Sequence, residues 1–356
     1  MSDVVVKTFN DSGCLAHLIG CAATRQALLV DPKAGRGGVY DKALADFGLE
    51  LAAVLDTHTH ADHLSGTAAW IQRGLPLWMS AKTTCERPHR GLAPGAVVTL
   101  GKLRFTALEV PGHTPDSIAL HGHGIVLTGD TLLAGGLARA DFRGSDPARL
   151  FDSVKRELLA LPDATVVLPG HGYQDILFTT IGHERARNPA LAHQDGRAYA
   201  ATLGTVEGAG NTPDVDATLE TNLAADPRLP EQAKAVAACC AMGSTAIAGP
   251  RVKEMKCEEL APDRAEFAKR KTWIDVRDPW ELAREGRIPG ARNIPLSELG
   301  LHLDELKRDG PVVLSCRSGG RSMTAAKTLA YLGVLREPIS MAGGFGRWKE
   351  LGLPTE

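Results

Sequence analysis

Residues 56–63 read DTHTHADH and directly follow the apolar run AAVL. This stretch brings together four side chains of metal-binding type: His58, His60, Asp62 and His63. The same placement recurs behind three later strand-like runs, where LEVPG precedes His113, IVLTG precedes Asp130 and VVLPG precedes His171. Loops at the ends of strands converge on the active crevice of α/β proteins. The sequence therefore predicts one metal site built at four strand ends.

The donor atoms of this site narrow the choice of ion. Imidazole nitrogens and carboxylate oxygens suit zinc, iron or manganese. Structural zinc sites commonly contain cysteine thiolates, and no cysteine stands at these four strand ends. We therefore expect a catalytic ion rather than a structural one.

The chain of 356 residues is long for one hydrophobic core, so two domains are expected. Short apolar runs separated by Gly, Pro and Asp indicate an α/β region of many strands over residues 1–190. The expected strands are 4–9, 15–20, 27–31, 52–56, 103–110, 118–120, 125–128 and 165–168. The expected helices are 39–47, 68–73 and 148–161.

The composition changes after residue 190. Alanine-rich polar segments predict a helical extension over 191–245, which completes a first domain of residues 1–245. A linker is expected at 246–264, followed by a second, compact α/β domain at 265–356. In the second domain we expect strands at 273–276 and 312–314 and a helix at 322–332.

A cysteine loop, CRSGGRS at residues 316–322, lies between the last expected strand and the last expected helix. Gly319 and Gly320 allow backbone amides to turn inward, and the helix adds the positive end of its dipole. Arg317 and Arg321 add positive charge. This setting favours the nucleophilic thiolate of Cys316 and suits a bound sulfur anion such as thiosulfate or sulfite.

Composition and charge exclude several classes of function. The chain is 44% hydrophobic and 23% charged, as is typical of globular proteins. A net charge of -2 gives no electrostatic footprint for nucleic acid or an anionic membrane. The opening MSDVVVKTFN has no signal-peptide pattern, and seven scattered cysteines indicate free thiols, so we expect a cytoplasmic protein. Buried packing roles are expected for the remaining cysteines: Cys14, Cys21, Cys85, Cys257 and the vicinal pair Cys239-Cys240.

The pattern THxHxDH, followed by separate GH, GD and GH elements, resembles the metallo-β-lactamase superfamily. This resemblance covers most of the first domain and implies a sandwich of two mixed sheets packed between helices (αββα). Members of the superfamily include two-metal thioesterases of the glyoxalase II type, nucleases, flavodiiron proteins and mononuclear iron persulfide dioxygenases.

The segments GDTLLAGGLARADFRG and HERARNPAL resemble the persulfide dioxygenases in particular. That resemblance implies a single Fe(II) held by His58, His113 and Asp130, with positions open for a persulfide and O2. The remaining residues of the cluster would surround these ligands, orienting them or handling protons: His60, Asp62, His63 and His171. All residues for a second metal are nevertheless present, so a dinuclear hydrolase stays open.

Three further residues are candidates for substrate contacts. Arg139 could pair with a carboxylate of glutathione, together with Asp141, and Tyr173 could donate a hydrogen bond to a substrate oxygen. A structural ion pair and a packed phenol are equally open interpretations.

The second domain resembles the rhodanese family through WIDVRDPWELAREGRIPGARNIP, the cysteine loop and GGFGRWKELGLP. The loop from Cys316 to Arg321 has six residues, as in sulfurtransferases, whereas the phosphatase relatives carry a longer one. The resemblance implies that Cys316 carries a sulfane sulfur. Arg317 and Arg321 would assist it, and the amides of Gly319 and Gly320 would bind the substrate anion.

Together the two resemblances imply a bifunctional enzyme of sulfur metabolism. One half would oxidise glutathione persulfide with O2 to sulfite and glutathione, and the other would transfer sulfur between thiosulfate and glutathione. A glyoxalase-II-like hydrolase with an accessory rhodanese stays open, as does a sulfur-binding module without turnover. The thiol carrier, the direction of transfer and a homo-oligomeric state also stay open.

Overall fold

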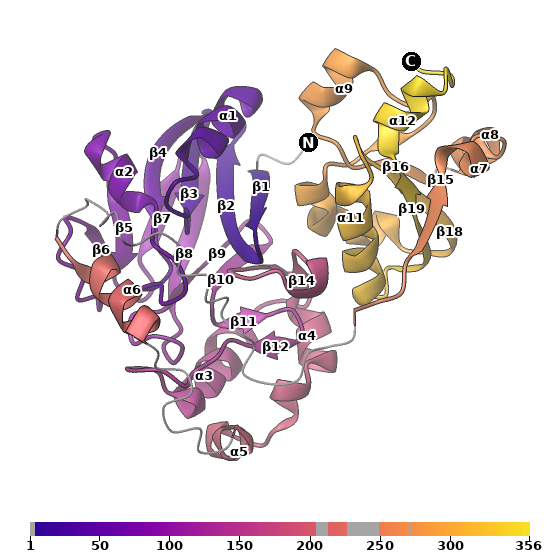
Figure 1. Cartoon of the computed structure of the whole chain (residues 1–356). Helices are drawn as coiled ribbons and strands as arrows, with labels where there is room; N and C mark the ends of the chain where they lie inside the picture. The colour runs from indigo at the N-terminus through magenta and orange to yellow at the C-terminus, as the bar shows by residue number, and fades with distance from the viewer. Residues whose placement is uncertain (1–3, 204–212, 226–248, 271) are drawn as a thin grey trace. The chain divides into compact units, whose positions relative to one another are not determined.

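The computed structural model describes residues 4–203, 213–225, 249–270 and 272–356 (Figure 1). The chain forms two compact units. The first unit comprises Met1–Gly172 and Phe178–Ile247, and the second comprises Tyr173–Leu177 and Ala248–Glu356. Each unit is built on its own sheets, as the sequence predicts for two α/β domains.

The first sheet of the first unit has its six strands in sequence order. They are β1 (Val4–Asp11), β2 (Cys14–Cys21), β3 (Gln26–Val30), β4 (Glu50–Leu55), β5 (Leu77–Ser80) and β6 (Arg90–Leu92). Helices α1 (Gly37–Phe47) and α2 (Thr67–Gln72) pack against this sheet through buried Tyr40, Leu44 and Trp70. Because β3, β4 and β5 run parallel, the loops after them open at the same edge.

The second sheet has the order β14-β13-β10-β9-β8-β7. Its strands are β7 (Val97–Leu100), β8 (Leu103–Glu109), β9 (Ile118–Gly122), β10 (Ile125–Gly129), β13 (Val166–Pro169) and β14 (Thr179–Thr180). A core on this sheet joins Val126 and Val167 to Phe151 of α3 (Pro147–Ser153) and Tyr199 of α5 (Gly196–Thr202). The first unit is thus two mixed sheets between helices, which confirms the expected αββα layers (Figure 1).

The helix expected at 148–161 is present but changes type along its length. Of the four residues in its expected apolar stripe, Leu150, Val154 and Leu158 are fully buried, and Leu161 is half-buried. After α3 the chain continues as a π-helical turn at Val154–Leu158, where the Leu159 amide donates to the Val154 carbonyl at 2.9 Å. Periodicity located the buried stripe but did not indicate the wider turn.

The second unit has a five-stranded sheet with the order β15-β19-β18-β16-β17, and every pair is parallel. The strands are β15 (Lys253–Lys256), β16 (Trp273–Asp275), β17 (Arg292–Asn293), β18 (Arg308–Ser315) and β19 (Leu335–Ala342). Its longer helices are α8 (Arg264–Arg270), α9 (Pro279–Glu285), α11 (Gly320–Tyr331) and α12 (Gly344–Glu350). The core contains Trp273, Phe345 and Trp348. Cys316 follows central strand β18 and precedes α11, as the sequence predicts.

Residues 253–260 are structured, although a linker was expected at 246–264. Lys253–Lys256 forms edge strand β15, which pairs with β19, and α7 (Cys257–Leu260) follows it. Cys257 and Leu260 are buried in the core of the second unit. The polar sequence of β15 conceals the strand, because an edge strand needs little apolar surface.

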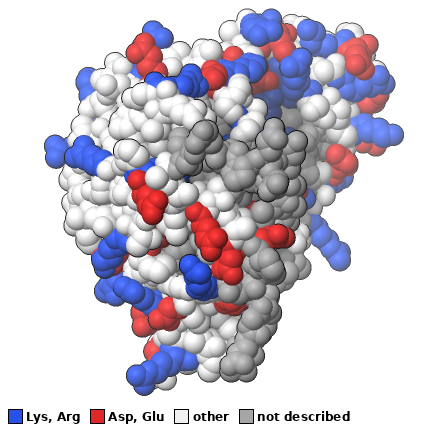
Figure 2. All heavy atoms as spheres, turned by 60° about the vertical axis from the view of Figure 1, so that its left-hand side comes forward, with Lys and Arg blue, Asp and Glu red and all other residues white. Residues whose placement is uncertain are grey.

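The helical extension expected at 191–245 is described in part. It contains α5 and α6 (Pro213–Leu223), and α4 (Ile181–Arg187) precedes it. The vicinal Cys239-Cys240 pair lies outside the described residues. No helix in the described parts of the chain combines the length and apolarity needed to cross a bilayer. Figure 2 shows acidic and basic side chains interspersed over the visible face, in keeping with the net charge of -2.

Candidate functional site

The expected metal-site residues come from four loops that follow strands of the first unit. The loop after β4 carries the DTHTHADH stretch, and the loops after β8, β10 and β13 carry His113, Asp130 and His171. All seven side chains are buried: His58, His60, Asp62, His63, His113, Asp130 and His171. Hydrogen bonds and ion pairs connect six of them, and His60 joins this cluster through its ring, 4.3 Å from that of His58.

His58, His113 and Asp130 form a compact group of potential ligands. The Oδ2 atom of Asp130 is 3.9 Å from the Nε2 of His58 and 3.6 Å from the Nε2 of His113. These three buried atoms have no hydrogen-bond partner among the described residues. Buried polar atoms without partners are costly, so the group fits a bound cation that would satisfy all three.

The other polar atom of each of these residues is held in place. Thr57 Oγ1 lies 2.9 Å from the Nδ1 of His58, and the Arg139 carbonyl oxygen lies 2.8 Å from the Nδ1 of His113. The Oδ1 of Asp130 lies 2.8 Å from the Nδ1 of His171. Such contacts fix the ring orientation of a metal-binding histidine and leave Nε2 for the ion.

His171 joins the triad to a second carboxylate. Its Nδ1 contacts Asp130, and its Nε2 lies 3.1 Å from the Oδ2 of Asp62. Burial opposes protonation of His171, but the two carboxylates raise its pKa well above the ordinary value. Burial likewise opposes ionisation of Asp62, but His63 and His171 lower the pKa of this carboxyl well below its usual range. The pair is suited to holding a proton next to the triad.

His60 is paired with two other carboxylates. Its Nε2 lies 3.4 Å from Asp31 Oδ1 and 3.6 Å from Asp56 Oδ1. Burial lowers the pKa of His60, but the two nearby carboxylates, Asp31 and Asp56, outweigh it and raise the pKa well above the ordinary value. Asp31 also accepts hydrogen bonds from the amide and hydroxyl of Thr57 at 2.7 and 2.9 Å. These buried contacts hold the DTHTHADH loop in place through His60 and Thr57.

The cysteine loop of the second unit surrounds a buried thiol. Cys316 is 1% exposed, and its Sγ accepts a hydrogen bond from the Gly319 amide at 3.1 Å. The Ser322 hydroxyl lies 3.6 Å from the same sulfur. Gly319 has φ of +104°, a conformation that favours glycine. The thiol therefore sits at the N-terminus of α11, where amide groups and the helix dipole stabilise an anion.

The two loop arginines differ in their surroundings. Arg321 forms a bidentate ion pair with Glu281 of α9, at 2.5 and 2.6 Å. Burial opposes the charge, but Glu281 raises the pKa of Arg321 above its ordinary value. The Arg317 side chain is 65% exposed, and its Nη2 is 3.6 Å from Glu285 Oε1. Glu281 is not identified by any sequence motif, and its carboxylate offsets much of the charge expected from Arg321.

The C-terminal Gly-Gly element holds the cysteine loop from the other side. The amides of Phe345 and Gly346 donate to the carbonyls of Cys316 and Arg317 at 2.7 and 2.9 Å. Gly344 has φ of +59°, and a Cβ there would lie 2.5 Å from the Cys316 carbonyl oxygen. Glycine at this position is therefore required for the close approach of α12 to the loop.

Comparison with known proteins finds a family match for each of the two units. A family model described as the Metallo-beta-lactamase superfamily matches residues 10–171. A hydroxyacylglutathione hydrolase of Anaeromyxobacter dehalogenans (strain 2CP-C) is 38% identical over 242 residues, which are 64% of this chain and 88% of that protein. This chain belongs to the metallo-beta-lactamase superfamily. A second model, described as Rhodanese-like domain, matches residues 261–351, so the chain carries a C-terminal rhodanese domain.

Other proteins to which this chain is similar carry the name ETHE1. The mitochondrial persulfide dioxygenase ETHE1 of Mus musculus is 29% identical over 188 residues, covering 51% of this chain and 74% of that protein. The crystal structure of ETHE1 from Myxococcus xanthus matches with a TM-score of 0.57 and 33% identity, over 61% of this chain and 97% of that one. Persulfide dioxygenases and hydroxyacylglutathione hydrolases are thus both relatives of the metallo-beta-lactamase unit.

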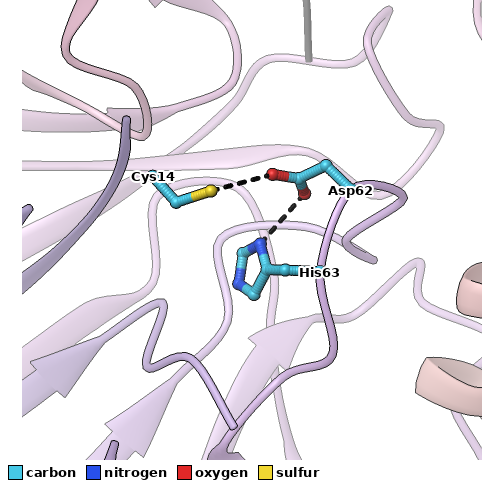
Figure 3. Close-up of side chains that lie close together, drawn as sticks. All are labelled: Cys14, Asp62 and His63. Atoms are coloured by element: carbon cyan, nitrogen blue, oxygen red, sulfur yellow. Dashed lines mark hydrogen bonds and ion pairs between the residues drawn. The ribbon is translucent and has the colours of Figure 1, made fainter. Parts of the chain in front are cut away.

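Two residues that contact the metallo-beta-lactamase site are not predicted by the sequence. Asn222 of α6 donates to the carbonyls of His60 and His63, both at 2.9 Å, although it lies about 160 residues away. Cys14 was expected to pack as an ordinary buried side chain, which is wrong. It is half-buried, and its Sγ lies 3.4 Å from Asp62 Oδ2 (Figure 3). No local sequence pattern predicts these contacts with the DTHTHADH loop, because Asn222 and Cys14 lie far from it in the sequence and reach it only in the folded chain.

The three residues expected to contact substrate lie in different units: Arg139 and Asp141 in the first and Tyr173 in the second. Arg139 donates from Nε to Asp141 at 2.6 Å, so the two pair with one another, and the Arg139 carbonyl orients His113. Tyr173 begins a 3-10 turn at Tyr173–Asp175 and belongs with the second unit. Contacts of these side chains with a substrate stay predictions.

Proposed function

We propose that this protein is an Fe(II)-dependent persulfide dioxygenase joined to a thiosulfate sulfurtransferase. The observation that carries the first activity is the buried triad of His58, His113 and Asp130, with one unpartnered ligand atom on each. Two imidazoles and one carboxylate form the donor set typical of non-haem Fe(II) oxygenases. Kinship with persulfide dioxygenases supports the same choice.

The proposed oxidation converts glutathione persulfide, O2 and water into glutathione and sulfite. Fe(II) bound by the triad would supply the O2 chemistry. The chain itself holds the triad rings in one orientation through Thr57 and the Arg139 carbonyl. His171, placed between Asp130 and Asp62, keeps a proton next to the site for the departing glutathione thiolate.

The proposed sulfur transfer proceeds through Cys316. Its thiolate attacks the sulfane sulfur of thiosulfate, the S–S bond breaks, and sulfite leaves with the electron pair. The thiolate of glutathione then attacks the outer sulfur of the Cys316 persulfide, which forms glutathione persulfide and restores the Cys316 thiolate. The amide of Gly319 stabilises the anionic sulfur throughout.

These two reactions share an intermediate, because the persulfide formed at Cys316 is the substrate of the oxidation. We further propose glutathione as the thiol carrier and a reducing cytoplasm as the setting. The reverse transfer, from a persulfide to sulfite, would form thiosulfate through the same cysteine. The direction depends on the supply of the two substrates.

Anaerobic purification followed by metal analysis and oxygen-electrode measurements tests the proposal. The expected result is about one iron per chain, as a single mononuclear site requires. O2 uptake should begin on addition of glutathione persulfide, and also on addition of thiosulfate with glutathione. Two zinc ions per chain and no O2 uptake with either substrate would contradict it.

A second candidate is a two-metal hydrolase of glutathione thioesters. It is favoured by the hydroxyacylglutathione hydrolase with 38% identity and by the nearness of Asp62, His63 and His171 to the triad. Two results together would favour this candidate over the dioxygenase. The protein would bind two metals, and it would hydrolyse S-lactoylglutathione at a turnover typical of enzymes, above about 1 per second.

A further inference from the structure

Two buried serine hydroxyls connect strand β19 to the sulfur of Cys316. The Ser322 hydroxyl, in the first turn of α11, lies 3.6 Å from this sulfur. The Ser340 hydroxyl of β19 lies 3.0 Å from that of Ser322. Ser340 is paired in the sheet with Leu314 of β18, shortly before the cysteine. Both serine side chains are fully buried, so their hydroxyls depend on protein partners for hydrogen bonds.

Each hydroxyl has a single proton, which determines the direction of these hydrogen bonds. Among the described residues, the Ser340 hydroxyl has no hydrogen-bond partner other than Ser322. A buried donor without an acceptor is costly, so Ser340 donates to the Ser322 oxygen. The Ser322 proton is then available to one of two acceptors, the Gly319 carbonyl oxygen at 2.9 Å or the Cys316 sulfur at 3.6 Å.

The charge on the sulfur decides between these two acceptors. A neutral Cys316 thiol donates its own proton to Ser322, and the Ser322 proton stays on the Gly319 carbonyl. A thiolate can only accept, and a hydrogen bond to a charged group is roughly twice as strong as a neutral one. The Ser322 proton therefore turns to the sulfur when the thiol ionises. Ser340 donates to the same oxygen in both states, so the oxygen stays in place while its proton changes partner.

We propose that Ser340 is a positioning residue for the sulfur transfer, because it holds the Ser322 hydroxyl ready to donate to the Cys316 thiolate. This assignment rests on the transfer proposed above. When an acceptor thiolate attacks the outer sulfur of the Cys316 persulfide, the electron pair of the S–S bond leaves on the Cys316 sulfur. The Ser322 hydroxyl then donates to the new thiolate and stabilises this leaving group. Ser340 strengthens that donor, since hydrogen bonds in a chain polarise one another.

Iodoacetamide labelling of Cys316 at a series of pH values, followed by peptide mass spectrometry of the full chain, tests the assignment. Ser340→Ala should raise the pH of half-maximal labelling by about half a unit to one unit, because the thiolate loses support. The same variant should lower kcat for transfer from thiosulfate by about three- to tenfold, the effect of losing one hydrogen bond. KM for thiosulfate should stay unchanged, because the buried hydroxyls offer no surface to the substrate anion.

Ser315 provides the matched control. It is a fully buried serine of β18, and its hydroxyl accepts a hydrogen bond from Trp273 Nε1 at 3.0 Å. Ser315→Ala removes the same group from the neighbouring strand. It should lower the urea midpoint but keep the labelling profile and kcat of the unmodified protein.

Ser322→Ala tests whether Ser340 acts through Ser322. This variant should shift the labelling profile at least as far as Ser340→Ala does. The combined variant should show no further shift, because Ser340 then has no hydroxyl to hold.

An unchanged labelling profile in Ser340→Ala overturns the proposal. An equal shift in Ser315→Ala also overturns it, because the effect would then come from packing alone. A full additional shift in the combined variant would show that Ser340 acts by another route and has the same consequence. If Ser340→Ala does not fold, Ser322→Ala decides, and a profile like that of the unmodified protein overturns the proposal. Absence of sulfur transfer in the unmodified protein would contradict the proposed function instead, since the labelling profiles do not require that transfer.

Discussion

His113 donates its Nδ1 proton to the main-chain carbonyl oxygen of Arg139 at 2.8 Å. The acceptor lies 26 residues further along the chain, just beyond the short hairpin of β11 (Leu132–Leu133) and β12 (Gly136–Leu137). Because a carbonyl can only accept, this contact fixes the tautomer that leaves Nε2 for a metal. The position of the hairpin therefore determines the orientation of a triad ligand.

Glu184 is the residue that anchors this hairpin. Its carboxylate accepts hydrogen bonds from the Gly135 amide at 2.9 Å, the Asn188 amide group at 2.8 Å and the Thr179 hydroxyl at 2.6 Å. Glu184→Ala should lower the free energy of unfolding by about 1–3 kcal/mol for each buried donor left unpaired. It should also speed metal loss, measured by transfer to a chelator.

The matched control for Glu184 is the exposed Glu220→Ala on α6. This variant should keep the urea midpoint and the metal off-rate of the unmodified protein. Unchanged metal release in Glu184→Ala, despite a lowered urea midpoint, would show that the hairpin does not control His113.

Thr57 tests the support of the other imidazole. Its hydroxyl lies 2.9 Å from both His58 Nδ1 and Asp31 Oδ2, so it accepts from the ring and donates to the carboxylate. Thr57→Val keeps the shape and removes both hydrogen bonds. We expect a 10- to 100-fold loss of iron affinity, the usual cost of losing a ligand's hydrogen-bond partner. Thr57→Ser retains the hydroxyl and should bind iron normally in the same chelator competition.

Two variants should separate the proposed activities. His113→Ala removes one of three triad ligands and should abolish iron binding and O2 uptake, while thiosulfate sulfurtransfer persists. Cys316→Ser should abolish sulfurtransfer and leave oxidation of supplied glutathione persulfide intact. Loss of persulfide oxidation in Cys316→Ser would show instead that the oxidation requires the rhodanese cysteine.

The seven residues at four strand ends could be predicted because strand ends are visible in a sequence. An apolar run followed by glycine and a histidine or aspartate identifies both the strand and the loop, as at Asp130 and His171. Asn222 and Cys14 could not be predicted in this way. Each contacts the DTHTHADH loop through packing between distant segments, and neither has a local pattern.

Strands with interrupted patterns were also missed. β19 carries Arg336, Glu337 and Pro338 before its buried end at Ile339–Met341, so its apolar run is too short to indicate a strand. Its pairing with β18 on one side and β15 on the other supplies what the local sequence lacks. Tertiary pairing thus overrides local propensity at this position.

Gly344 tests whether the C-terminal element holds the cysteine loop in place. Gly344→Ala would place a Cβ 2.5 Å from the Cys316 carbonyl oxygen, at a backbone φ of +59°. Displacement of the loop should lower kcat for thiosulfate sulfurtransfer by at least about tenfold, the effect of misplacing a reacting group. Gly352→Ala is the control, because φ is +65° there and no described atom lies within 4 Å of the new Cβ. Equal losses in both variants would assign the effect to backbone strain alone.

Cys257 makes the stability of the second unit depend on pH. Burial and then the charge of Glu258 raise the pKa of Cys257 to about 11. The unfolded chain loses this proton at the ordinary value near 8.5. The contribution of the Cys257 thiol to the free energy of unfolding is therefore complete below its ordinary pKa, and it is lost as the pH rises towards 11. The urea midpoint of the unmodified protein should fall over this interval more than that of Cys257→Ala, and iodoacetamide should label Cys257 slowly at pH 8 and faster towards pH 11. Parallel pH profiles of the two proteins, or rapid labelling of Cys257 at pH 8, would contradict the raised pKa.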